Sequence, residues 1–192
     1  LEVMNTPYRD MRVNAFLVWD PDTKAGAVFD SGTDSTKLVD KAIGAGITID
    51  TIFITHTHND HIADLDELKA ACEDVCVYSN EAEPWPGTQI FSEGDSFSIG
   101  NLSINTFTTS GHSVGGTTYY IEGLEKPVAV VGDAMFAGSM GGGMISFAEA
   151  WKNNREKILS LPDETIICPG HGPMTSVGEE KQNNPFFAAE FR

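Results

Sequence analysis

Apolar and polar residues alternate along this chain with two different periods, and the change of period divides the chain into strands and helices. Short runs rich in β-branched and aromatic residues, bounded by Gly, Pro, Asp or Asn, predict strands. These runs are residues 12–19, 25–29, 47–55, 76–79, 96–99, 102–108, 117–122, 128–131 and 165–168. Two of the intervening segments, Asp20-Pro21-Asp22 and Gly100-Asn101, are turn signals and predict hairpins.

Three other segments carry apolar residues at helical spacing. Residues 34–45 predict a helix capped by Asp34 or Ser35. Residues 62–71 predict a second helix. The capping box Ser146-Phe147-Ala148-Glu149 predicts the start of a third, which should run to about residue 161. This mixture of elements predicts an α+β fold with two packed sheets.

Length and charge narrow the class of protein. A chain of 192 residues is large enough to bury a sizeable core, so we expect one domain over residues 1–192. The net charge of −16, with only 12 Lys and Arg, disfavours a nucleic-acid groove, because so few scattered cations cannot neutralise a row of phosphates. We therefore expect no nucleic acid as a partner. The expected substrate is a small molecule.

Two further features bear on the compartment. No apolar run reaches membrane-spanning length and no signal peptide is recognisable, so we expect no membrane partner and a cytoplasmic location. The three cysteines, Cys72, Cys76 and Cys168, are odd in number and lack a metal-binding spacing. They predict free thiols, with Cys168 as a small buried apolar group.

The segment Thr55-His56-Thr57-His58-Asn59-Asp60-His61 carries the candidate chemistry, because four of its seven residues can bind a metal. His56 and His58 continue the alternation of the strand before them, so both imidazoles should leave the chain on the same side. Asp60 lies two positions further on, and His61 begins the next element. Three histidines within six positions, with a carboxylate among them, indicate a metal site.

The two remaining histidines occupy similar positions. His112 and His171 each lie in a loop rich in Gly, Ser or Pro, just after a predicted strand. Asp133 likewise follows the strand at residues 128–131. Alone, Asp133 would be interpreted as a loop residue or a helix N-cap. Together with five histidines at strand ends, it favours a single metal centre.

With these residues in this order, the chain resembles the metallo-β-lactamase superfamily. The resemblance rests on the His56-x-His58-x-Asp60-His61 box followed by His112, Asp133 and His171, and it covers residues 14–185. Residues 132–139, 169–174 and 179–185 resemble the short, single-domain members of the glyoxalase II-like branch. The resemblance implies an αββα sandwich of two mixed sheets flanked by helices, with the site along one edge.

The resemblance also implies how metals are held. It divides seven ligands between two divalent ions, three for each ion and one as a bridge. In that order they are His56, His58 and His112; Asp60, His61 and His171; and Asp133. Asp60 would also be the catalytic residue, as the proton acceptor that orients a metal-activated hydroxide. Imidazole and carboxylate ligands suit zinc, iron or manganese, and we expect zinc first.

Asp133 favours one branch of the superfamily. The best-known lactamases place a Cys there, whereas an Asp bridge fits glyoxalase II-like hydrolysis of a small thioester or acyl ester. Glutathione-using members carry Lys or Arg where this chain has Gly142, and they use a C-terminal helical domain. The sequence therefore predicts a hydroxyacylglutathione hydrolase-like thioesterase and leaves glutathione recognition open. Phe136, Met140 and Met144 are candidate pocket residues, in or beside a loop at residues 138–143 that should form a pocket wall.

Three alternatives remain. A mononuclear iron persulfide dioxygenase would hold iron through His56, His112 and Asp133, although residues 137–142 lack the Arg-bearing loop of that branch. A lactonase, lactamase or phosphodiesterase of the same fold is the second alternative. A metal-binding protein without catalysis is the third.

Overall fold

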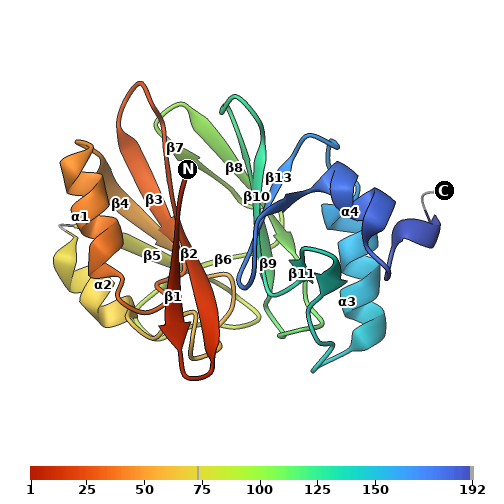
Figure 1. Cartoon of the computed structure of the whole chain (residues 1–192). Coiled ribbons are helices and arrows are strands. Elements are labelled where there is room, and N and C mark those ends of the chain that lie inside the picture. Colours follow the sequence, from red (N-terminus) through yellow and green to blue (C-terminus); the bar gives the residue numbers. More distant parts are fainter. Residues whose placement is uncertain (73, 191–192) are drawn as a thin grey trace.

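The first sheet starts with an antiparallel hairpin and continues with parallel strands (Figure 1). The computed structural model describes residues 1–72 and 74–190, and in this part the sheet has six strands. In spatial order they are β1 (Glu2–Tyr8), β2 (Met11–Trp19), β3 (Ala25–Phe29), β4 (Thr48–Phe53), β5 (Cys76–Asn80) and β6 (Gln89–Phe91). The strands from β3 to β6 pair in parallel. Helices α1 (Thr36–Gly44) and α2 (Leu65–Ala71) connect β3 to β4 and β4 to β5.

The second sheet is mostly antiparallel and also has six strands within the described residues. Its spatial order is β14 (Thr175–Ser176), β13 (Ile166–Pro169), β10 (Val128–Gly132), β9 (Thr117–Glu122), β8 (Leu102–Thr108) and β7 (Ser96–Ile99). Only β10 and β13 pair in parallel. A small hairpin of β11 (Met135–Phe136) and β12 (Ser139–Met140) follows β10. Helix α3 (Phe147–Asn153), its π-helical extension (Asn154–Ile158), α4 (Val177–Asn183) and a 3-10 turn (Ala188–Glu190) complete this half.

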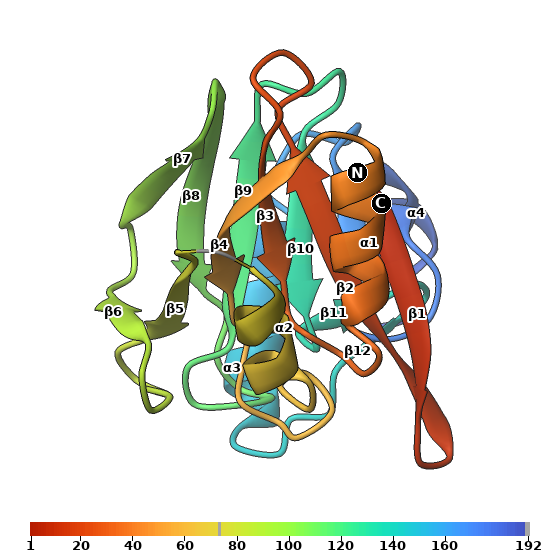
Figure 2. The ribbon, with the colours of Figure 1, turned by 90° about the vertical axis from the view of Figure 1, so that its left-hand side faces the viewer.

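The two sheets pack face to face, with α1 and α2 outside one sheet and α3 and α4 outside the other (Figures 1 and 2). Phe29, Phe53 and Tyr119 fill the space between the sheets, with ring centroids 5.0–5.3 Å apart. Leu38 and Leu68 belong to a second core under α1 and α2, and a third core lies under α3 and α4. The predicted αββα sandwich is therefore confirmed. None of the described helices is long and apolar enough to cross a membrane.

Several boundaries differ from the sequence prediction. The strand β1 was not predicted, because only Thr6 of its seven residues is buried and it pairs only with β2 at the sheet edge. Helix α2 begins at Leu65, three residues after the predicted start. The capping box forms by half: Ser146 accepts from the backbone N–H of Glu149, but the Glu149 carboxylate accepts from Ser110.

The fold brings the ends of distant strands to one edge. Since β3 and β4 are parallel, as are β10 and β13, the loops after each pair leave the sheets side by side. Hydrogen bonds join the two sheets at this edge, from Asn14 N to Gly170 O at 2.7 Å and from Thr117 N to Thr55 O at 2.9 Å. The edge therefore collects the loops that carry the candidate ligands.

Candidate metal centre

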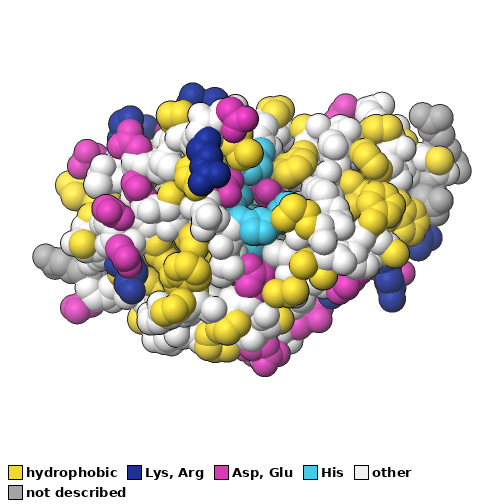
Figure 3. Space-filling model, turned by 90° about the horizontal axis from the view of Figure 1, so that it is seen from below, with side chains coloured by type: hydrophobic (Ala, Val, Ile, Leu, Met, Phe, Trp, Pro, Cys, Tyr) yellow, Lys and Arg dark blue, Asp and Glu magenta, His cyan; other side chains and the backbone are white. Residues whose placement is uncertain are grey.

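All seven candidate ligands lie in loops at this edge, and the structure brings them together. His56, His58, Asp60 and His61 follow β4, and His112 lies between β8 and β9. The other two, Asp133 and His171, follow β10 and β13. In Figure 3, which views this edge, His side chains lie beside acidic and hydrophobic ones.

Three imidazoles form the first ligand group. The Nδ1 atom of His58 lies 3.0 Å from His56 Nε2 and 3.0 Å from His112 Nε2. A tetrahedral zinc ion with Zn–N bonds of about 2.0–2.1 Å separates its ligand nitrogens by about 3.3 Å. These three nitrogens are thus spaced as ligands of one cation would be.

The strand alternation predicted for His56 and His58 does not explain why their imidazoles lie together. Strand β4 ends at Phe53, three residues before His56, so the strand period does not extend through the histidines. His56 presents its Nε2 atom to the group and His58 presents its Nδ1 atom. The two rings therefore meet because the loop after β4 turns.

Asp60, His61 and His171 form the second ligand group. Asp60 Oδ2 lies 3.2 Å from His171 Nε2 and 3.5 Å from His61 Nε2. His61 is fully buried, whereas Asp60 and His171 are partly exposed. This group therefore combines two imidazoles with one carboxylate and remains accessible from one side.

The carboxylate of Asp133 lies between the two groups. Its Oδ2 atom is 3.4 Å from His112 Nε2 in the first group and 3.3 Å from His171 Nε2 in the second. Its Oδ1 atom is 3.3 Å from His61 Nε2. One side chain thus reaches both groups.

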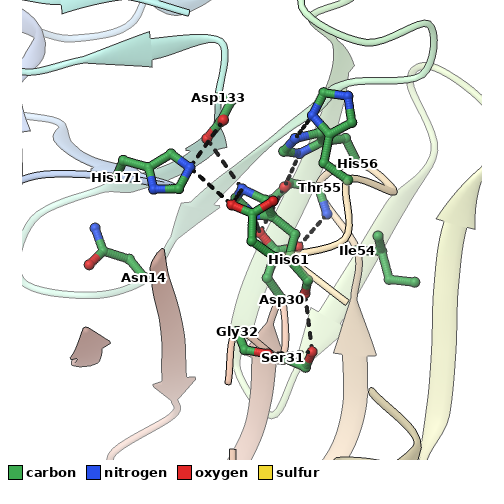
Figure 4. Close-up of polar contacts among 12 residues, drawn as sticks. Asn14, Asp30, Ser31, Gly32, Ile54, Thr55, His56, His61, Asp133 and His171 are labelled. Carbon is green, nitrogen blue, oxygen red and sulfur yellow. Dashed lines mark hydrogen bonds and ion pairs between the residues drawn. The ribbon is translucent and has the colours of Figure 1, made fainter. Parts of the chain in front are cut away.

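The interior of the site fits bound cations. His61 Nε2 and Asp133 Oδ1 are buried and lie 3.3 Å apart (Figure 4), but neither atom has a hydrogen-bond partner of good geometry. Burying polar atoms without partners is costly, and a metal ion would satisfy both. Gly170 keeps the space open, since a Cβ atom there would lie 2.2 Å from Asp133 Oδ1 and 2.5 Å from His61 Cε1.

Asp30 orients one imidazole of each group. His61 Nδ1 lies 2.7 Å from Asp30 Oδ2, and the Thr55 hydroxyl donates to the same oxygen at 2.8 Å. Because the Thr55 hydroxyl proton is used in this way, its oxygen accepts from His56 Nδ1 at 3.0 Å. In both rings Nδ1 is thus the donor, and Nε2 is the atom that would bind a cation.

Backbone carbonyls orient two more imidazoles. His112 Nδ1 donates to Gly142 O at 2.9 Å, and His171 Nδ1 donates to Arg12 O at 2.5 Å. A carbonyl can only accept, so Nδ1 carries a proton in both rings and Nε2 is left as the nitrogen that would bind a cation. The partners that fix the imidazole tautomers could not be named from the sequence.

Glu83 joins two of the ligand loops. Its carboxylate accepts from Thr57 N at 2.7 Å and from the Thr57 hydroxyl at 2.6 Å in the loop after β4. It also accepts from Gly115 N at 2.8 Å, in the loop that carries His112. Burial raises the pKa of Glu83, but these bonds outweigh it and lower the pKa. No local sequence pattern identified Glu83, so its role was missed.

The loop at residues 138–143 supports ligands more than it lines a pocket. Its Gly142 carbonyl holds His112, as described above. Of the candidate pocket residues, Phe136 lines the cavity beside the metal centre. Met140 is buried in the core under α3 and α4, so the prediction for Met140 is wrong. Met144 is 65% exposed and does not line that cavity.

The charges of the site follow from burial and neighbours. Burial lowers the pKa of His56 well below its usual value. Burial also lowers the pKa of His61, but the charge of Asp30 and the nearby Asp133 reverse this and raise the pKa to about 10. Hydrogen bonding to Asp133 raises the pKa of His171 to about 10. Burial raises the pKa of Asp133, yet the neighbouring imidazoles of His171 and His61 keep it well below its usual value. In the second group, a cation would therefore have to displace protons.

The three cysteines are free thiols, as expected. Cys168 is fully buried between the sheets, and burial raises the pKa of its thiol to about 12. This environment is that of an inert packing residue.

A sandwich of this kind, with a cluster of imidazoles and carboxylates at its edge, defines a metallo-hydrolase. Residues 8–171 match the family model of the metallo-β-lactamase superfamily, and the chain belongs to that superfamily. Its members bind divalent metals, and the His and Asp cluster described above has the geometry to do so.

Three proteins illustrate the similarity. Hydroxyacylglutathione hydrolase GloC of Haemophilus influenzae is 28% identical, over 94% of this chain and 95% of the relative. The crystal structure of BLEG-1 B3 metallo-β-lactamase superposes with a TM-score of 0.84 at 28% identity, over 96% of this chain and 99% of that chain. TTHA1623, whose crystal structure is of a di-iron-bound form, superposes with a TM-score of 0.79 at 26% identity, over 96% and 100%.

Proposed function

We propose that this metallo-hydrolase uses two divalent ions to hydrolyse a small thioester. The proposed ligands are three residues for each ion and one bridge. They are His56, His58 and His112; Asp60, His61 and His171; and Asp133. The position of Asp133 supports this division most directly, because its Oδ2 atom lies 3.4 Å or less from an imidazole nitrogen of each group. The similar protein TTHA1623 holds two irons, which favours a dinuclear site in this chain; zinc remains the first expectation.

Two ions at this site would lower the pKa of a shared water to about 7 and so supply hydroxide at neutral pH. The protein residues position the reaction. Asp60, on the partly exposed side of the second group, would accept the proton of the attacking water and fix its orientation. Asp30 and the carbonyls of Gly142 and Arg12 hold the imidazole rings still, so little reorganisation is needed during the reaction.

We propose a thioester because the chain is similar to GloC and because it has Asp133 where the best-known lactamases have a Cys. GloC carries the name of a hydroxyacylglutathione hydrolase, and hydroxyacylglutathione is a thioester. GloC aligns over 95% of its own length, so a C-terminal helical domain is not part of that relative. The thioester proposal therefore does not depend on such a domain. Recognition of glutathione itself would need a substitute for the cation that Gly142 does not provide.

A hydrolysis panel on metal-loaded protein tests this function. The panel holds a neutral thioester, a lactone, a β-lactam and a phosphodiester, and the measurement is kcat/KM for each. We expect the thioester to exceed the others at least tenfold. A β-lactam as the best substrate would instead assign the activity suggested by the similarity to BLEG-1. Oxygen uptake on glutathione persulfide with one iron per chain would contradict the hydrolase.

A further inference from the structure

A large cavity opens beside the metal centre. It has a volume of about 920 Å³, and His112, Asp133 and His171 form part of its lining. This volume lies near the upper end of the range for small-molecule sites, which is about 300–1,000 Å³. The cavity therefore has room for the non-reacting parts of a substrate as well as for the bond that is cleaved.

The N-terminal hairpin of β1 and β2 forms one wall of this cavity. Val3, Asn5, Met11, Arg12 and Asn14 contribute to the lining from this hairpin. Every second residue of a strand lies on the same face of the sheet, so Val3 and Asn5 share a face of β1, and Arg12 and Asn14 share a face of β2. The observed register pairs Asn5 with Asn14. Val3 and Met11 are 37% and 49% exposed, so the wall offers apolar surface to a ligand.

The hairpin is fixed relative to the metal centre. Arg12 O accepts from His171 Nδ1. The side-chain amide of Asn14 donates to Pro169 O and to Gly172 O, both at 2.9 Å, on either side of His171. A group carried by this hairpin therefore has a defined position relative to the second ligand group.

Arg12 is the only Lys or Arg among the described residues that line the cavity. Its Nε and Nη2 atoms donate to the side-chain and backbone oxygens of Asn5, which holds the guanidinium in place. No described carboxylate pairs with Arg12, and its Nη1 group has no partner among the described residues. In a chain with a net charge of −16, an oriented guanidinium in a cavity wall that no described carboxylate neutralises is suited to bind an anion.

We propose that Arg12 binds a carboxylate at the non-reacting end of the substrate, and that the substrate is an anionic thioester with an apolar segment between the two groups. This inference rests on the proposed thioester hydrolysis. The apolar segment would lie against Val3 and Met11 on one wall and Phe136 and Met174 on the other. The charge of Arg12 would favour anionic substrates, and the apolar surface would contact the segment between the carboxylate and the thioester.

The test measures binding separately from turnover. The probes are ketone analogues, in which a methylene replaces the thioester sulfur so that hydrolysis cannot occur. Each probe ends in a carboxylate or in a carboxamide, placed on the acyl arm in one pair and on the thiol arm in the other. Calorimetry gives the dissociation constants for the metal-loaded wild type, Arg12→Gln and Arg9→Gln. Arg9 lies in the exposed turn of the same hairpin and does not line the cavity, so its substitution matches the change in net charge.

We expect the wild type to bind the carboxylate probe about five- to tenfold more tightly than the carboxamide in at least one pair. Arg12→Gln should abolish this preference, and Arg9→Gln should keep it. The pair that shows the preference tells which arm carries the charge. Equal binding of carboxylate and carboxamide by the wild type in both pairs, or a preference that survives Arg12→Gln, would overturn the inference.

The two proposals fail in different ways. Hydrolysis of a neutral thioester by the wild type reports on the proposed function and does not depend on the guanidinium of Arg12. A protein that hydrolyses the neutral thioester but shows no carboxylate preference keeps its function and loses this inference. A protein that prefers carboxylate probes through Arg12 but hydrolyses no thioester keeps the anion site and loses the thioester as its substrate.

Discussion

Substitution of Asp30 by alanine should lower the free energy of unfolding by about 3–5 kcal/mol and remove metal from both ligand groups. The buried Asp30 carboxylate accepts from Thr55 N, the Thr55 hydroxyl and His61 Nδ1, at 2.7–2.8 Å. Alanine leaves these buried donors without a partner. It also places a β-carbon without a polar group at a backbone φ of +59°, which alanine disfavours more than aspartate.

The matched variant Asp30→Asn separates the fold from the metal. Asparagine tolerates the positive φ and can still accept from Thr55 N, so much of the stability should remain. Its amide would face His61 Nδ1 with a donor, however, and this favours the tautomer with a proton on Nε2. We expect Asp30→Asn to melt closer to the wild type than Asp30→Ala does and yet to bind less metal. Full metal content in Asp30→Asn, measured by mass spectrometry, would contradict the role of Asp30 in orienting His61.

Substitution of Asp60 by asparagine should reduce kcat by about 10²–10⁴-fold while most of the metal remains bound. Asparagine keeps one oxygen as a potential ligand, but it cannot accept the proton of the attacking water. The expected signature is a loss in kcat at nearly constant metal content. His58→Ala, by comparison, removes a nitrogen that lies 3.0 Å from two others and should lose metal and activity together.

Asp66→Asn is the control for the Asp60 substitution. Asp66 lies exposed on α2, so its replacement changes the net charge equally without touching the site. Its kcat should stay within twofold of the wild type. Turnover at the wild-type rate in Asp60→Asn would show that Asp60 is not the proton acceptor.

The sequence was sufficient to predict which residues converge, because strand ends can be recognised locally. His112, Asp133 and His171 each follow a recognisable apolar run, and strand ends in such a fold meet at one edge. What fixes these side chains could not be predicted in the same way. Asp30 follows a strand too, but only the parallel pairing of β3 with β4 places its carboxylate beside His61.

The position of the N-terminal hairpin could not be predicted from local sequence patterns either. Strand β1 has a weak apolar signal because it lies at the sheet edge with a single buried residue, and its sequence alone gives no reason to place it beside a metal centre. Its importance depends on the bonds from Asn14 to the loop around His171. Such contacts link residues more than 150 positions apart, so local patterns carry no information about them.

The number of metal ions per chain tests the account most directly. Native mass spectrometry of the folded protein, loaded with zinc and then desalted, counts bound ions without reference to any substrate. Two ions per chain are expected, falling to one or none in Asp133→Ala, because that side chain lies between both ligand groups. A wild-type protein that never binds more than one ion would contradict the dinuclear centre.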